Sequence, residues 1–194
     1  MPMPAPDSVL KIDKSAPEFK RLCEFAVRLN ALLAKPKVQA DPNLPDALVD
    51  FLGALYALVL ARTLGFDDRT GGKKPERDKV QTRALDVSNG RIRLDGKWMA
   101  GFHFNSALLR LSAVYHRALR VITGDHIRKH MVGDLLPQLT YPWPHPNIEK
   151  VHTEVNKLKH DGGGLGGGRD AKFKQALDAV DELLNLVEAC PAFH

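Results

Sequence analysis

Residues 44–65, LPDALVDFLGALYALVLARTLG, decide the fold class of this chain. Pro45 stands where a helix can begin and Gly65 where it can end, since Pro fits the first helical turn and Gly the residue after the last one. From Phe51 to Ala61 every side of this helix is apolar. Such a helix is typical of the centre of a helical bundle or of a seam between subunits.

Further helices are predicted on both sides of this segment from apolar residues at spacings of three and four. The first begins at Ser15, where Ser15 and Glu18 can form a capping box, and ends before Pro36. The others run from near Asn105 to Gly124, from Asn147 as N-cap to about His160, and from Asp170 towards the C-terminus. We therefore predict a mainly α fold, an up-down bundle of four to five long helices.

Two turn signals interrupt the helical pattern, Asn-Gly at residues 89–90 and Asp-Gly at residues 95–96. The Asp-Gly pair can close a two-residue hairpin in which Arg93 faces Trp98 across the strands. An irregular loop is the alternative for this stretch. We predict a small β-hairpin insertion.

Length and composition fit one globular domain. The chain has 194 residues, of which 44% are hydrophobic and 26% charged, and these values exclude a disordered chain. We predict a flexible N-terminal arm over residues 1–14 and a single helical-bundle domain over residues 15–194, in which residues 66–103 form a linker and the hairpin insertion. Cys23 and Cys190 are separated by most of the chain, which argues against a disulfide scaffold or a thiolate zinc site.

The formal net charge of +5 is unevenly distributed. Residues 66–129 contain 14 Lys or Arg and 7 Asp or Glu, a net +7, whereas residues 170–194 contain 2 and 5, a net −3. A polyanionic partner is therefore expected to meet the middle of the chain first. Residues 1–15 lack the pattern of a secretory signal, and the apolar run is too short to span a bilayer of about 30 Å. We expect a cytoplasmic protein without a membrane partner.

The best candidate for chemistry is the stretch EVNKLKH, residues 154–160. Steps of four place His152, Asn156 and His160 on one stripe of the predicted helix, beside its apolar stripe. A neutral imidazole can accept the 2′-hydroxyl proton of RNA, and an imidazolium can protonate a leaving oxygen. An Asn amide can orient a phosphate, and neighbouring lysines can offset the charge on a pentacoordinate phosphorus.

A helix that ends in Asn-x-x-x-His, followed by a loop and a last amphipathic helix, resembles the HEPN superfamily. The resemblance implies a small helical bundle, and many members are ribonucleases of toxin–antitoxin, abortive-infection and CRISPR systems. Asn156 and His160 match the Asn and His of the family motif, whereas Val155 stands where the family has Arg. The resemblance also implies a homodimer in which His160 faces its own copy across a two-fold axis.

Two functions follow from this resemblance. In the first, the protein engages RNA as a metal-independent endoribonuclease effector of a bacterial toxin or antiphage defence system, with His160 and Asn156 as the catalytic residues. The residues expected to contact the substrate are Lys157, Lys159, Arg169 and His152. In the second, it is a non-catalytic interaction or scaffold module within a larger complex, like the superfamily members that lack the full motif.

Other roles stay open for several of these residues. His160 can cap the end of its helix, where an imidazole gains from the helix dipole. The glycines of residues 162–168 can form a mobile linker, or close over RNA together with Arg169, although they lack a GxxxxGK[ST] pattern. His126 and His130 have the spacing of two zinc ligands on a helix, but no third ligand is suggested nearby. We predict no metal site and no cofactor.

Overall fold

The computed structural model describes the backbone of residues 16–40, 44–64, 85–88, 91–94, 96–125, 130–139, 145–161 and 169–190. Side chains are described for residues 16–40, 46–64, 100–125, 130–139, 145–156 and 172–190. The arm predicted over residues 1–14 and the glycines of residues 162–168 lie outside the described residues.

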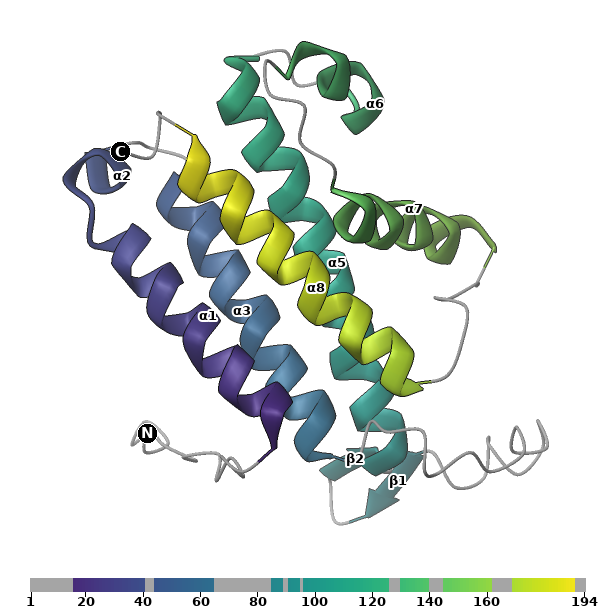
Figure 1. Ribbon diagram of the computed structural model, residues 1–194. Helices are drawn as coiled ribbons and strands as arrows, with labels where there is room; N and C mark the ends of the chain where they lie inside the picture. The colour runs from purple at the N-terminus through teal and green to yellow at the C-terminus, as the bar shows by residue number, and fades with distance from the viewer. Residues whose placement is uncertain are drawn as a thin grey trace.

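The protein is mainly helical, as predicted (Figure 1). The long helices are α1 (Pro17–Leu33), α3 (Leu44–Thr63), α5 (Gly96–Thr123), α7 (Pro146–Asp161) and α8 (Arg169–Ala189). Two short α-helices, α2 (Pro36–Ala40) and α6 (Val132–Leu135), and the 3-10 helix η1 (Leu136–Gln138) raise the number of helices in the described residues above the predicted four to five. Two four-residue strands, β1 (Leu85–Ser88) and β2 (Arg91–Leu94), pair antiparallel with Leu85 opposite Leu94.

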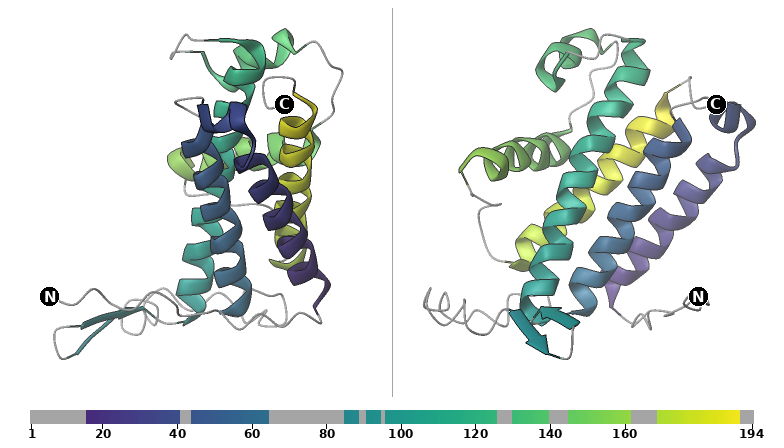
Figure 2. Two further views of the ribbon diagram at one scale, coloured as in Figure 1. Left: turned by 90° about the vertical axis from the view of Figure 1, so that its left-hand side faces the viewer. Right: turned by 180° about the vertical axis from the view of Figure 1, so that it is seen from behind.

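The helices α1, α3 and α5 lie side by side, and α8 packs across one side of this layer (Figures 1 and 2). α5 runs antiparallel to α3, and α7 contacts both α5 and α8. The core lies between the layer and α8, where Phe51, Leu111 and Leu183 are fully buried. Among the described residues, no helix combines the length and apolar character needed to cross a membrane.

The start of α5 differs from the prediction. This helix begins at Gly96 rather than near Asn105 and is 28 residues long. The hairpin predicted to close at residues 95–96 is therefore not supported, because Gly96 belongs to a helix. Ala100 and Phe104 are buried and extend the apolar stripe of α5 towards its N-terminus. Packing of these side chains on the core thus outweighs the local turn signal.

Ser15, which was predicted to form a capping box with Glu18, lies outside the described residues, so the capping box stays a prediction. Ala16 precedes the first residue of α1 and provides no side-chain cap. Glu18 accepts a hydrogen bond of 2.8 Å from Nε of Arg62 in α3. The guanidinium of Arg62 also lies over the ring of Phe173 in α8, 5.6 Å from its centroid. One arginine therefore connects three helices.

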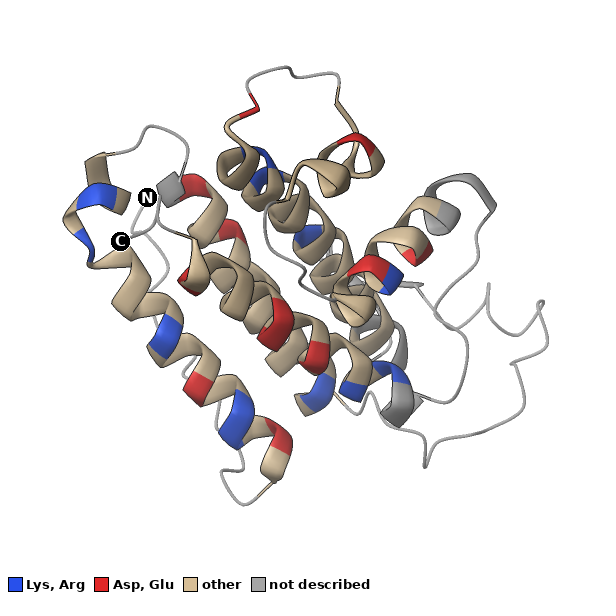
Figure 3. Ribbon diagram, turned by 45° about the horizontal axis from the view of Figure 1, so that its top comes forward, with Lys and Arg blue, Asp and Glu red and all other residues tan. Residues whose placement is uncertain are grey.

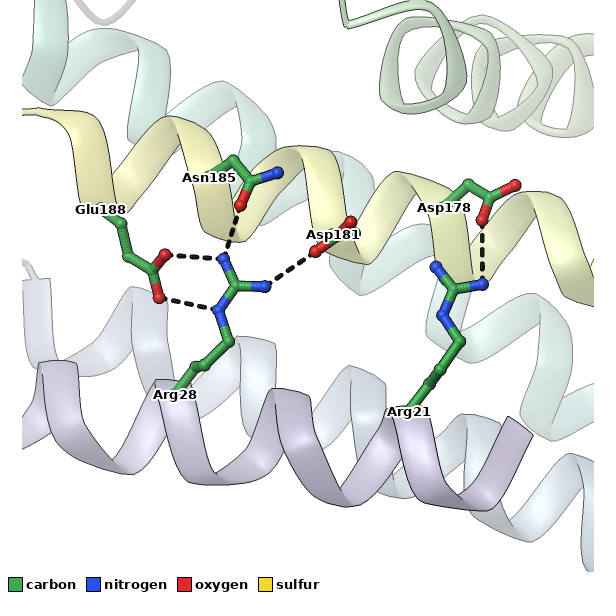
Figure 4. Close-up of polar contacts among 6 residues, drawn as sticks. All are labelled: Arg21, Arg28, Asp178, Asp181, Asn185 and Glu188. Carbon is green, nitrogen blue, oxygen red and sulfur yellow. Dashed lines mark hydrogen bonds and ion pairs between the residues drawn. The ribbon is translucent and has the colours of Figure 1, made fainter. Parts of the chain in front are cut away.

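Ion pairs fix α1 along α8 (Figure 4). Figure 3 shows where the charged residues lie along the described helices. Arg28 donates to the carboxylate of Glu188 through Nε at 2.9 Å and Nη2 at 2.6 Å, and to Asp181 through Nη1 at 2.7 Å. A second pair joins Arg21 to Asp178 at 2.9 Å. Three of the acidic residues near the C-terminus, Asp178, Asp181 and Glu188, thus bind α1.

We predict that Arg28→Ala lowers the free energy of unfolding by about 1–3 kcal/mol, because two neighbouring carboxylates lose their charge-assisted donor. The range stays modest because all three side chains keep partial contact with solvent, which screens the charges. Urea denaturation measures the loss. Arg28→Lys keeps the positive charge without the bidentate geometry. Its free energy of unfolding should therefore lie between those of Arg28→Ala and the parent. Equal stability of Arg28→Ala and the parent would contradict this role.

Candidate functional site

α7 carries the predicted stripe of polar residues and presents His152 to α5. Nδ1 of His152 lies 2.8 Å from Oγ of Ser112, and Nε2 lies 3.2 Å from Nδ2 of Asn156. Both ring nitrogens of His152 therefore lie within hydrogen-bonding distance of a polar side chain, one on α5 and one on α7 itself.

Two buried rings complete this site, which we call the α5–α7 polar cluster: Ser112, Tyr115, His145, His152 and Asn156. The Tyr115 ring lies edge-on to His145 and His152, with centroids 6.3 and 6.1 Å apart. Tyr115 and His145 are fully buried, and the Tyr115 hydroxyl has no hydrogen-bond partner among the described residues. Burial raises the pKa of Tyr115 and lowers the pKa of His145, so both groups are uncharged at neutral pH.

The start of α7 is fixed from α8 by the carboxylate of Glu182. The backbone N–H groups of Asn147 and Ile148 donate to its Oε2 at 2.9 Å each, and Nδ2 of Asn147 donates to Oε1 at 2.7 Å. The first N–H groups of a helix lack an acceptor within the helix, and an anion at this end also gains from the helix dipole. The prediction that Asn147 itself caps this helix is therefore wrong, because the capping group comes from Glu182.

Of the predicted site residues, the structure brings His152 and Asn156 together. The side chains that lie outside the described residues are those of Lys157, Lys159, His160 and Arg169. The backbone of α7 continues to Asp161, so His160 keeps its place on the helical stripe two turns after His152. Val155, at the position of the family arginine, is 1% exposed and packs in the core.

The basic middle of the chain is described only in part. Arg110 and Arg117 of α5 donate to the two carboxylate oxygens of Asp50 in α3, at 2.9 and 2.8 Å. Most of the Lys and Arg side chains of residues 66–129 lie outside the described residues. Arg110 and Arg117 are therefore engaged between helices, and the expected contact with a polyanion stays a prediction.

The histidine pair considered as a zinc site is also described in part. His126 lies outside the described residues, whereas Nδ1 of His130 lies 2.9 Å from Oδ2 of Asp125. The carbonyl oxygen of His130 accepts a hydrogen bond of 2.8 Å from Nε2 of His116. His130 thus helps to attach the segment after α5 to that helix.

Sequence reasoning missed Ser112, Tyr115 and His145 of the polar cluster, and it also missed Glu182, which fixes the start of α7. Ser112 lies 40 residues before its partner His152, and Glu182 lies 35 residues after Asn147. Spacing within one helix carries no signal for such pairs, because the partner is chosen by how the helices pack. His145 lies in a proline-rich stretch, residues 141–146, whose sequence indicates an extended connector and gives no sign that the imidazole is buried.

Comparison with known proteins gives no match: no family model, no curated protein and no solved structure is significantly similar to the chain.

We predict that acidification below about pH 6.5 destabilises the protein in part through His145. The unfolded chain binds a proton near the ordinary pKa of 6.5, whereas burial lowers the folded-state pKa of His145. Its contribution is therefore complete above the ordinary pKa and is lost as the pH falls towards the lower folded-state value. Urea denaturation at several pH values measures this dependence.

The control for this experiment is His145→Phe, which cannot titrate. We expect its free energy of unfolding to fall less between neutral pH and about pH 5.5 than that of the parent. His145→Gln serves as a second variant, because its side chain does not titrate and is smaller than that of Phe at this buried position. Identical pH profiles for the parent and both variants would show that His145 does not contribute.

Proposed function

We propose that this protein is a non-catalytic, HEPN-like interaction module that forms one subunit of a larger protein assembly. The observation that supports this proposal is an apolar surface on two helices, which we call the α3–α5 face. It comprises Val49 and Tyr56 of α3 and Phe102 and Leu109 of α5, which are 57%, 52%, 60% and 44% exposed. Large apolar side chains gathered on one surface are typical of sites that bind another protein.

The geometry places these four side chains on one side of the molecule. The residues of each pair are seven apart, about two helical turns, so they share one side of their helix. The buried residues Phe51 and Leu58 lie on the opposite side of α3, towards the core. Seen from behind in Figure 2, α3 and α5 lie in front of α8, and none of the described helices covers them. The α3–α5 face is therefore open to a partner.

The α5–α7 polar cluster supports a structural role for the first half of the α7 stripe. Both ring nitrogens of His152 are hydrogen-bonded, and its neighbours Ser112 and Tyr115 are buried. Val155, at the position where the family motif has a cationic side chain, is apolar and buried. These contacts favour the interaction module over the ribonuclease.

We predict that the double substitution Tyr56→Glu and Phe102→Glu releases the chain from its assembly, because a carboxylate buried at an interface without a partner is costly. Native electrophoresis of the tagged chain from producing cells measures the effect. Val27→Glu is the matched control, since Val27 is 68% exposed on α1, away from the α3–α5 face. A parent chain that migrates at its own mass would contradict the proposal.

RNA engagement is the second candidate, with the protein as an endoribonuclease of a bacterial toxin or antiphage defence system. The length of α7 favours it, because the helix continues to Asp161 and so keeps His160 four residues after Asn156 on one stripe. In this role His160 is the general acid and base, and Asn156 orients the phosphate. The proposed contacts to the RNA backbone are Lys157, Lys159 and Arg169.

We predict for this second candidate that His160→Ala reduces RNA cleavage about 100-fold or more, because general acid–base catalysis is lost. Cleavage of labelled single-stranded RNA by the purified chain measures it, in the presence of a chelator. His103→Ala, a histidine substitution on α5, is the control. The ribonuclease assignment fails if His160→Ala is as active as the parent or if the parent shows no salt-sensitive affinity for RNA.

A further inference from the structure

We propose that the occupant of the α3–α5 face is a second copy of this chain, related to the first by a two-fold axis parallel to α3 and α5. The inference rests on the interaction module proposed above and identifies its partner. In this arrangement α3 of one protomer lies over α5 of the other, and the same contact is formed twice.

One end of the α3–α5 face is charged. Asp50 of α3 binds Arg110 and Arg117 of α5, and a Cβ atom on Gly53 would lie 3.0 Å from Nη1 of Arg110. The first half of α3 is therefore level with the second half of α5. Asp46, one turn before Asp50, is exposed at this end.

The rest of the face is apolar. Tyr56 follows Gly53 by about one turn, and Leu109 precedes Arg110, so both lie near the middle of the helix pair. Phe102 lies two turns before Leu109, towards the C-terminal end of α3. In both α3 and α5, charged side chains lie at one end of the face and apolar side chains follow them. The charged parts of the two helices are level with each other, and so are the apolar parts.

The charges on the two helices are complementary. α3 contributes Asp46 and Asp50, and α5 contributes Arg110 and Arg117, whose side chains are 45% and 49% exposed. A two-fold axis parallel to the helices places α3 over the partner's α5 at the same height. Asp46 then comes opposite the partner subunit's Arg117, and the reciprocal pair forms on the other side of the axis.

A two-fold axis perpendicular to the helices does not give this match. It places α3 over the partner's α3 in the opposite direction, so that the charged end of each protomer meets the apolar end near Phe102 of the other. The carboxylates and guanidinium groups would then lose water without gaining an opposite charge, which is costly. The charge pattern therefore favours the axis parallel to the helices.

The size of the face suits a stable dimer. α3 has 20 residues, which span about 30 Å, and two helices side by side are about 20 Å wide. The resulting footprint, on the order of 600 Å², is comparable with the ~800 Å² that each partner buries in a stable interface. An apolar middle with charges at one end also resembles the apolar centre and polar rim of such interfaces.

Sedimentation equilibrium of the purified full-length chain tests whether the second copy binds. We expect a mass twice the 21.5 kDa of one chain, and we expect the double substitution Tyr56→Glu and Phe102→Glu to give one chain mass. Val27→Glu should leave the dimer intact. A purified parent that sediments as a single chain over a wide concentration range would overturn the inference.

A charge swap tests the axis. Asp46→Arg and Arg117→Asp should each weaken self-association about tenfold or more, because like charges then face each other twice. An equimolar mixture of the two variants should regain the affinity of the parent, since each new arginine faces a new aspartate. A mixture as weak as the separate variants would exclude the parallel axis.

Cysteine pairs give a second measure of the axis. In a Cys23→Ser background, which removes the exposed native thiol, a chain with Tyr56→Cys and a differently tagged chain with Leu109→Cys should form a disulfide when mixed and oxidised. Each variant alone should cross-link weakly. Stronger cross-linking of Tyr56→Cys with itself would place α3 over α3 and overturn the proposed arrangement.

The outcomes separate this inference from the proposed function. If the purified parent is a single chain but the Tyr56 and Phe102 variant still leaves the cellular assembly, the partner is another protein and only the second-copy inference fails. If the variant changes neither the purified chain nor the cellular assembly, both proposals fail.

Discussion

The burial of α3 is the constraint on which the rest of the structure depends. A helix that is apolar on all sides must be covered by several neighbours, and α3 contacts both α1 and α5 and carries Arg62 over a ring of α8. Two of its charged groups lie at the borders between helices, where Arg62 binds Glu18 and Asp50 binds two arginines of α5. The side that no described helix covers keeps its apolar residues, which is why the α3–α5 face exists.

α8 supplies the second level of organisation through acidic residues that serve two different helices. Asp181 and Glu188 bind Arg28 and so hold α1, whereas Glu182 accepts from the first N–H groups of α7. The neighbouring positions 181 and 182 point about 100° apart on a helix, which allows one acidic stretch to reach both sides. The position of the polar cluster therefore depends on α8, although α8 contributes none of its five residues.

Most helices could be predicted from the sequence because burial of one stripe is a local property. The predicted bounds of α1, α3, α7 and α8 lie close to those observed. The start of α5 could not be predicted, because the Asp-Gly turn signal competes with the packing of Ala100 and Phe104 on a core assembled from distant segments. The same reason applies to Glu18 and Glu182, whose partners are determined by how helices meet rather than by local spacing.

The candidate site shows this limit most clearly. A spacing of four residues is enough to place His152 beside Asn156, but it does not tell which helix the stripe faces. Both ring nitrogens of His152, which a general acid or base would need, are already engaged, Nε2 with Asn156 and Nδ1 with Ser112. Freeing either nitrogen costs on the order of 1 kcal/mol per hydrogen bond and would loosen the packing of α7 on α5. The contacts of His152 therefore hold α7 on α5, and they were chosen by how these two helices pack rather than by the spacing within α7.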